Sequence, residues 1–160
     1  MIICDNNLRG YVKIKDPKEY ALYLLKFKDR SERGVEEKMK QKGFFDSEIK
    51  EVIVFLLKKK LIDEKKLADN IIRDGLEFKL WGKYRIQKKL LQEMIKNNIV
   101  EQSLAEISYE DELKSILLAR DKWQKRNKLK SFEDKQKLMG FLSRRGYGFE
   151  LISEVCSQID

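Results

Sequence analysis

The stretch VEEKMKQKGFFDSEIKEVI, residues 35–53, recurs twice along the chain in altered form. Its apolar positions return 51 residues later in IQKKLLQEMIKNNIVEQSL (86–104) and 103 residues later in LMGFLSRRGYGFELISEVC (138–156). In each copy apolar residues stand four apart, a turn follows, and apolar residues begin again, as in two packed amphipathic helices. Three copies of one pattern indicate small helical units that bury their apolar faces against one another.

Capping residues predict where the helices of the first unit begin and end. The run Asp16-Pro17-Lys18-Glu19 supplies an N-cap, a first-turn proline and a capping-box acid. Ser31 is placed to cap the next helix, and Gly43 to end it in a left-handed conformation. Asp46 is predicted to cap a third helix, and Asp63 to accept backbone N–H groups at the start of the fourth.

The later units follow the same plan. The apolar spacing predicts one helix over 67–76, a second over 86–94 and a third over 100–107, with Asn97 at the position of Asp46. Ser108 and Ser131 are each followed three residues later by an aspartate, which indicates two further helix starts. The expected total is about nine helices.

The predicted fold class is therefore all-α: three tandem three-helix, helix-turn-helix-like repeats in an elongated, curved arrangement. The expected organisation is an N-terminal arm (1–15) and three helical repeats (16–62, 63–107 and 108–160). Within the arm, residues 11–14 fit either an extended strand or a loosely attached segment.

Composition narrows the class of function. Among 160 residues there are 35 basic and 27 acidic side chains, giving a net charge of +8 that favours phosphate or an acidic protein surface. The chain has no histidine, no Gly-rich phosphate loop and no nucleophile elbow, so we expect no catalytic residue and no cofactor. Cys4 and Cys156 fit no metal-ligand spacing, and we expect Cys156 in the core and no metal site.

The same features point to a cytoplasmic protein. Two distant cysteines make a disulfide framework improbable, which favours a reducing compartment. The longest apolar run, Val52 to Leu57, is far too short to span a bilayer, and the N-terminus lacks the pattern of a signal peptide.

Four motifs, in order, resemble those of the RecX family of regulatory proteins. They are ALYLL (21–25) with RSE (30–32) and KMKQKGF (38–44), then LIDEKKLA (61–68), GKYRI (82–86) with KL (89–90), and FLSRRGYGFELI (141–152). Glu64 and Leu67 are mild departures from the family's paired acids and aromatic, and Met94 replaces a glycine that is frequent in the second unit.

The resemblance, which covers residues 20–156, implies a non-enzymatic regulator built from tandem three-helix units. It implies binding to the RecA recombinase filament on DNA, in the groove of the filament or at its growing end. It also implies restraint of ATP hydrolysis and strand exchange in DNA recombination, DNA repair and the SOS response. We expect a monomer that binds DNA directly but weakly.

Charge is unevenly distributed along the chain. Residues 79–98 carry six basic and one acidic side chain, and residues 120–145 carry ten and three. This predicts a cationic surface made by the second and third repeats, with an acidic side nearby. The candidate partner-binding or DNA-binding residues are Lys83, Arg85, Lys88, Lys89, Arg120, Lys122, Lys125, Arg126, Arg144 and Arg145.

Simpler roles remain open for several of these residues. Lys88 and Lys89 are equally compatible with solvating a helix face, and Arg144 and Arg145 with structural pairing. Trp81 and Trp123 are expected in the core rather than stacked on a base.

Two other functions remain as alternatives. A helix-turn-helix-type nucleic-acid-binding protein would lay a helix in the major groove and bind DNA alone with strong salt dependence. A nuclease or an ATPase has no site in the sequence to support it.

Overall fold

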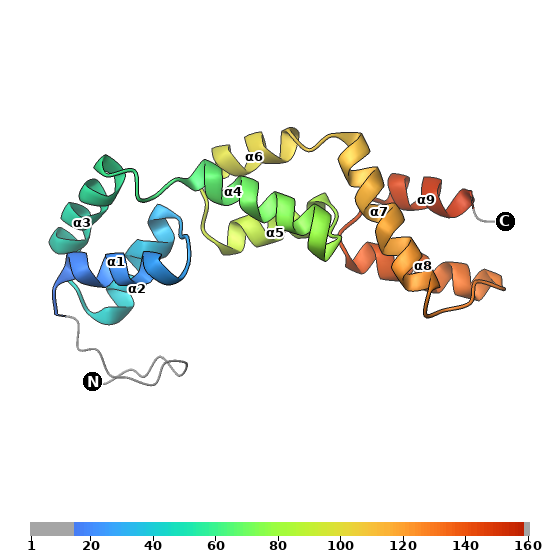
Figure 1. The fold of residues 1–160 in the computed structure, drawn as a ribbon, viewed down its shortest axis with the longest axis horizontal. Helices are drawn as coiled ribbons and strands as arrows, with labels where there is room; N and C mark the ends of the chain where they lie inside the picture. The colour runs from blue at the N-terminus through green and yellow to red at the C-terminus, as the bar shows by residue number, and fades with distance from the viewer. Residues whose placement is uncertain (1–14, 159–160) are drawn as a thin grey trace. The chain divides into compact units, whose positions relative to one another are not determined.

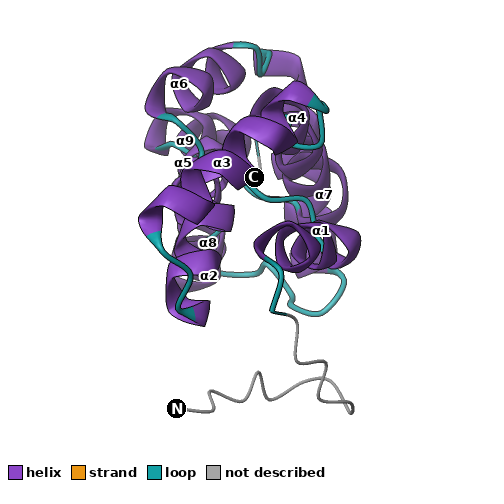
Figure 2. Ribbon diagram, turned by 90° about the vertical axis from the view of Figure 1, so that its left-hand side faces the viewer, coloured by secondary structure: helices purple, strands orange, loops and turns teal. Residues whose placement is uncertain are grey.

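The computed structural model describes residues 15–158, and these residues are all-helical, with nine α-helices, one π-helical segment and no strand (Figures 1 and 2). The predicted strand or arm over 11–14 lies outside the described residues. The first three helices are α1 (Pro17–Phe27), α2 (Glu32–Lys42) and α3 (Asp46–Lys58). They are followed by α4 (Glu64–Arg73), the π-helix η1 (Asp74–Lys79), α5 (Lys83–Gln92) and α6 (Asn97–Ala105). The last three are α7 (Tyr109–Gln124), α8 (Phe132–Arg144) and α9 (Phe149–Ser157).

The chain groups into two units, each with a core of its own. The first unit contains the described residues up to Leu67 together with Glu93–Ile95, and the second contains Ala68–Gln92 and the described residues from Lys96 onward. In the first, buried side chains of α1, α2 and α3 form one apolar cluster that includes Met39 and Leu56. In the second, side chains of α7, α8 and α9 form another cluster around Ile116 and Leu142. The predicted repeat boundaries remain a prediction.

A short polar contact ties Glu93 into the first unit. Ser31 Oγ donates to the Glu93 carbonyl oxygen at 2.6 Å, and Lys28 Nζ lies 2.7 and 2.8 Å from the two carboxylate oxygens of Glu93. Ser31 also accepts a hydrogen bond from Gly34 N at 3.0 Å, as a helix N-cap should. The predicted cap at Ser31 is confirmed, and the same side chain holds a segment 62 residues further along the chain.

Most of the predicted helix ends are confirmed. Asp16 accepts from Glu19 N, Asp63 accepts from Lys66 N, and Ser108 and Ser131 cap α7 and α8. The predicted cap at Asp46 is wrong, because Asp46 is the first helical residue of α3 and Phe45 is the N-cap. The carboxylate of Glu48 accepts the Phe45 N–H at 2.8 Å, so the acid three residues into α3 does the capping.

The same template position is left-handed in all three copies of the pattern. Gly43 has φ +95° and Gly146 has φ +87°, and Met94, which occupies the equivalent position in the second copy, has φ +58°. A side chain with a Cβ atom is disfavoured in this region. The second copy nevertheless has the left-handed turn, with methionine in place of glycine.

The helix predicted over 67–76 divides into α4 and the π-helix η1. Gly75 is buried against α5, and a Cβ atom there would lie 2.8 Å from Ile86 Cγ1. The segment ends at Leu80, which is buried and left-handed at φ +53°, and Trp81 N donates to the Gly75 carbonyl at 2.8 Å. Wide turns of this kind often mark functional sites, and this one delivers Trp81 to the start of α5.

Candidate functional site

A groove in the second unit collects cationic and aromatic side chains from α5 and from the end of α8. Its volume is about 530 Å³, and none of the described residues that line it is acidic. We call it the cationic groove, and it is lined by Trp81, Tyr84, Arg85, Lys88, Lys89, Gln92, Arg144 and Gly146.

The turn after α8 docks on the start of α5 and so forms the groove. Gly82 N donates to the Arg145 carbonyl at 2.9 Å, and Tyr84 N donates to the Gly146 carbonyl at 3.1 Å. The backbones approach so closely that a Cβ atom on Gly82 would lie 2.3 Å from the Gly146 oxygen. These bonds satisfy two N–H groups at the N-terminal end of α5 and bring Arg144 next to Arg85.

Arg85 is held in place before any ligand arrives. Its guanidinium carbon lies 4.8 Å from the centre of the Trp81 ring, and its Nη1 donates to the Arg144 carbonyl at 3.1 Å. Lys79 Nζ lies 4.7 Å from the same ring, so Trp81 contacts two cations. A planar guanidinium fixed by stacking keeps further N–H donors for a phosphate or a carboxylate.

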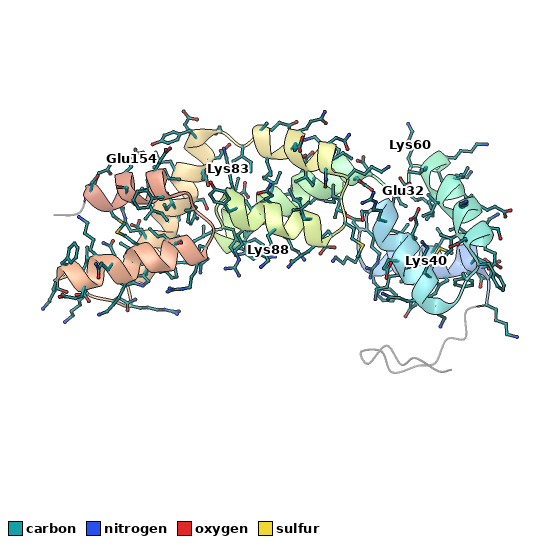
Figure 3. The ribbon with its side chains drawn as sticks, turned by 180° about the vertical axis from the view of Figure 1, so that it is seen from behind. Glu32, Lys40, Lys60, Lys83, Lys88 and Glu154 are labelled. Carbon is teal, nitrogen blue, oxygen red and sulfur yellow. The ribbon has the colours of Figure 1, made fainter. Side chains whose placement is uncertain are left out.

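Four of the ten predicted site residues line the cationic groove: Arg85, Lys88, Lys89 and Arg144. Lys83 does not, because its Nζ lies 3.9 Å from Glu112 Oε2 and its backbone N–H donates to Glu112 Oε1 at 3.0 Å. Figure 3 shows Lys83 and Lys88 on different sides of α5.

Arg145 has a structural role. Its Nη1 donates to the carbonyl oxygens of Lys79 and Leu80, the latter at 3.3 Å, and its guanidinium carbon lies 4.8 Å from the centre of the Phe141 ring. This arginine therefore fastens the turn after α8 to the end of η1. Structural pairing, left open by the sequence for both neighbouring arginines, applies to Arg145.

The remaining predicted residues lie along α7 and just beyond it, away from the groove. Arg120 pairs with the neighbouring Asp121 at 2.9 Å. Lys122, Lys125 and Arg126 are exposed at the C-terminal end of α7 and do not line the groove.

Two aromatic residues of the groove were not among the predicted site residues. Trp81, expected in the core, is half-buried and lines the groove, whereas Trp123 does pack against the core of the second unit. Tyr84 is 67% exposed. Its position between Lys83 and Arg85 was the available signal, since aromatic residues interleaved with basic ones are typical of nucleic-acid-binding surfaces.

A buried cluster of hydrogen bonds stabilises the turn after α8. Ser115 Oγ donates to the Leu76 carbonyl at 2.9 Å, and the Tyr147 hydroxyl donates to Ser115 Oγ at 2.8 Å. Burial disfavours the charged phenolate and raises the pKa of Tyr147 to about 12. Because Tyr147 follows Gly146 directly, this cluster fixes the turn that carries Arg144 and Arg145.

Comparisons with known proteins identify the family. A family model described as "RecX, first three-helix domain" matches residues 18–56, and one described as "RecX, third three-helix domain" matches residues 116–156. A "Regulatory protein RecX" of Thermotoga maritima is 33% identical over 154 residues, which cover 93% of this chain and 88% of that protein. The chain belongs to the RecX family. A RecX protein of Clostridium botulinum (strain Eklund 17B / Type B) is 30% identical and matches over 88% of this chain and 67% of its own length.

Solved RecX structures agree with the fold. The crystal structure of RecX from Lactobacillus salivarius has a TM-score of 0.80 at 22% identity, covering 90% of this chain and 94% of that one. A second, described as the crystal structure of regulatory protein RecX, has a TM-score of 0.76 at 18% identity. The expected fold class of a RecX protein, all-helical with three-helix domains, is thus confirmed.

The described residues of this RecX chain contain no group of three or more side chains placed to hold a metal ion. No helix among them is long and apolar enough to cross a membrane. RecX is a family of regulatory proteins, and the cationic groove offers binding groups rather than an arrangement of a nucleophile and a base.

Proposed function

We propose that this chain regulates the RecA recombinase by binding the RecA filament assembled on DNA and restraining its ATP hydrolysis and strand exchange. Membership of the RecX family carries the proposal. The cationic groove adds a surface suited to a partner that presents phosphate or carboxylate groups. We propose further that the protein acts as a monomer in DNA recombination, DNA repair and the SOS response.

The test is the ATPase rate of RecA on single-stranded DNA with and without this protein. A lower rate at substoichiometric or equimolar amounts supports the proposal. An unchanged rate at both ratios contradicts it and favours the helix-turn-helix-type DNA-binding alternative, for which duplex affinity without RecA would be the positive result.

Charge neutralisation tests the part played by the groove. The triple variant Arg85→Gln/Lys88→Gln/Arg144→Gln removes three positive charges that line it. The control Lys122→Gln/Lys125→Gln/Arg126→Gln removes three positive charges outside it. We expect weaker and less salt-dependent filament binding for the first triple only, since each lost phosphate contact reduces the salt slope. Equal loss in both triples would show that net charge, not the groove, drives binding.

A further inference from the structure

Tyr84 presents an exposed aromatic ring in a groove that is otherwise lined by cations. The side chain is 67% exposed. Its backbone is fixed by the hydrogen bond to Gly146, and Gly148 lies so near that a Cβ atom there would stand 3.7 Å from Tyr84 Cε2. The ring therefore rests near the Gly148 backbone and leaves most of its surface to solvent. A large aromatic side chain held in this way is a ready surface for stacking.

The cations around the ring come from two helices. Lys88 lies one helical turn beyond Tyr84 on the same side of α5, and Arg85 lies beside it. Arg144 reaches the groove from the end of α8. No acidic side chain among the described lining residues opposes an anionic ligand. The groove of about 530 Å³ is within the range of small-molecule sites, about 300–1,000 Å³.

We propose that the cationic groove binds single-stranded nucleic acid, with one unpaired base stacked on Tyr84 and the flanking phosphates held by Arg85, Lys88 and Arg144. A base in a duplex is already stacked on its neighbours, so only an unpaired base can use the ring. An acidic protein segment would pair with the cations and leave the exposed ring without a role. The inference deepens the proposed function by naming the ligand of the groove, and its test needs no recombinase.

Trp81 provides a reporter inside the groove. The chain has two tryptophans, and Trp123 packs against the core of the second unit. The variant Trp123→Phe therefore leaves Trp81 as the only tryptophan of the protein. In that background the protein is titrated with an oligodeoxythymidine, with an abasic oligonucleotide of equal length, and with a duplex. We expect saturable quenching by oligodeoxythymidine and binding of the abasic strand about tenfold or more weaker.

Substitutions at Tyr84 separate stacking from charge. Tyr84→Ala should weaken oligodeoxythymidine binding about tenfold and leave abasic-strand binding unchanged, whereas Tyr84→Phe keeps the ring and should keep the affinity. Phe132→Ala is the matched control, because Phe132 is 71% exposed and lies at the opposite end of α8 from Arg144. Far-UV circular dichroism checks that each variant is folded.

Three results would overturn the inference. They are equal affinity for the abasic and thymidine strands, tighter binding of duplex than of single strand, and competition by polyglutamate at charge concentrations equal to those of the oligonucleotide. A plot of the logarithm of the binding constant against the logarithm of the salt concentration should have a slope of about −2, as three phosphate contacts on a single strand predict. A RecA ATPase rate that this protein leaves unchanged would contradict the proposed function alone, since oligonucleotide binding is measured without RecA.

Discussion

At the three left-handed turns, glycine should give a higher free energy of unfolding than alanine. Gly43, Met94 and Gly146 all have positive φ, and a Cβ atom there costs roughly 1–2 kcal/mol. Alanine recovers part of this cost because it restricts the unfolded chain, by about 0.4–1 kcal/mol. The net advantage of glycine over alanine should therefore be about 1 kcal/mol where nothing else interferes.

Position 43 isolates the backbone effect. A Cβ atom on Gly43 would meet no other atom within 4 Å, so Gly43→Ala should lower the free energy of unfolding by about 1 kcal/mol. At position 94 the comparison is between Met94→Gly and Met94→Ala, which both remove the methionine side chain. The glycine variant should be the more stable of the two by about the same amount.

Gly146 should be much less tolerant. A Cβ atom there would lie 2.4 Å from Arg85 N and 2.5 Å from Arg85 Cβ, and backbone atoms cannot move aside as a flexible side chain can. Overpacking typically adds about 1–3 kcal/mol to the cost of the turn itself. The control is Gly140→Ala within α8, where the nearest atom is the flexible end of Arg144 at 3.3 Å. Helix propensity there should favour alanine by roughly 0.5–1 kcal/mol.

Equilibrium urea unfolding followed by circular dichroism measures these differences. Gly146→Ala should lower the free energy of unfolding the most, and Gly43→Ala should lower it less. Gly140→Ala should raise it. Alanine as stable as glycine at positions 43 and 94 would refute the assignment of the left-handed turns. A Gly146→Ala variant no worse than Gly43→Ala would refute the close docking of the turn after α8 on α5.

Three further predictions concern buried groups. Ser115→Ala should cost about 1–3 kcal/mol in unfolding experiments, because the Leu76 carbonyl and the Tyr147 hydroxyl both lose their partner. Burial raises the pKa of Tyr147 to about 12, above its ordinary value of 10.0. The stability that Tyr147 contributes is therefore complete below pH 10 and falls as the pH rises toward 12. In an alkaline absorbance titration, the last step should disappear in the variant Tyr147→Phe. Burial also raises the pKa of the Cys156 thiol, so in a Cys4→Ser variant thiol reagents should modify Cys156 slowly in buffer and rapidly in urea, and equal rates would contradict its place in the core.

The sequence predicts helix ends correctly where the determining contacts are local. Ser31, Ser108 and Ser131 each accept a hydrogen bond from the backbone three residues ahead, and such short-range chemistry is visible in the order of residues. The left-handed turn at Gly43 was predicted for the same reason, since few other residues adopt this backbone conformation readily.

Contacts between residues far apart in the chain could not be predicted from the sequence. Lys83 and Arg145 resembled their neighbours in charge, yet Glu112 binds the first and the carbonyl groups at 79 and 80 bind the second. Apolar periodicity did not predict the π-helix, in which Gly75 packs closely against Ile86, a residue of the next helix. Met94 adopts the left-handed turn without glycine, at the position that glycine occupies in the other two copies.

The cationic groove exists only because residues of the predicted second and third repeats are in contact. The start of α5 donates to carbonyl groups of the turn after α8, and that turn places Arg144 opposite Arg85. A chain ending at residue 107 would retain Tyr84, Arg85 and Lys88 but lose both backbone acceptors and Arg144. It follows that the second repeat alone should carry much of the charge of the groove without its geometry. Binding in the groove should therefore depend on the packing of the third repeat as well as on the cations of α5.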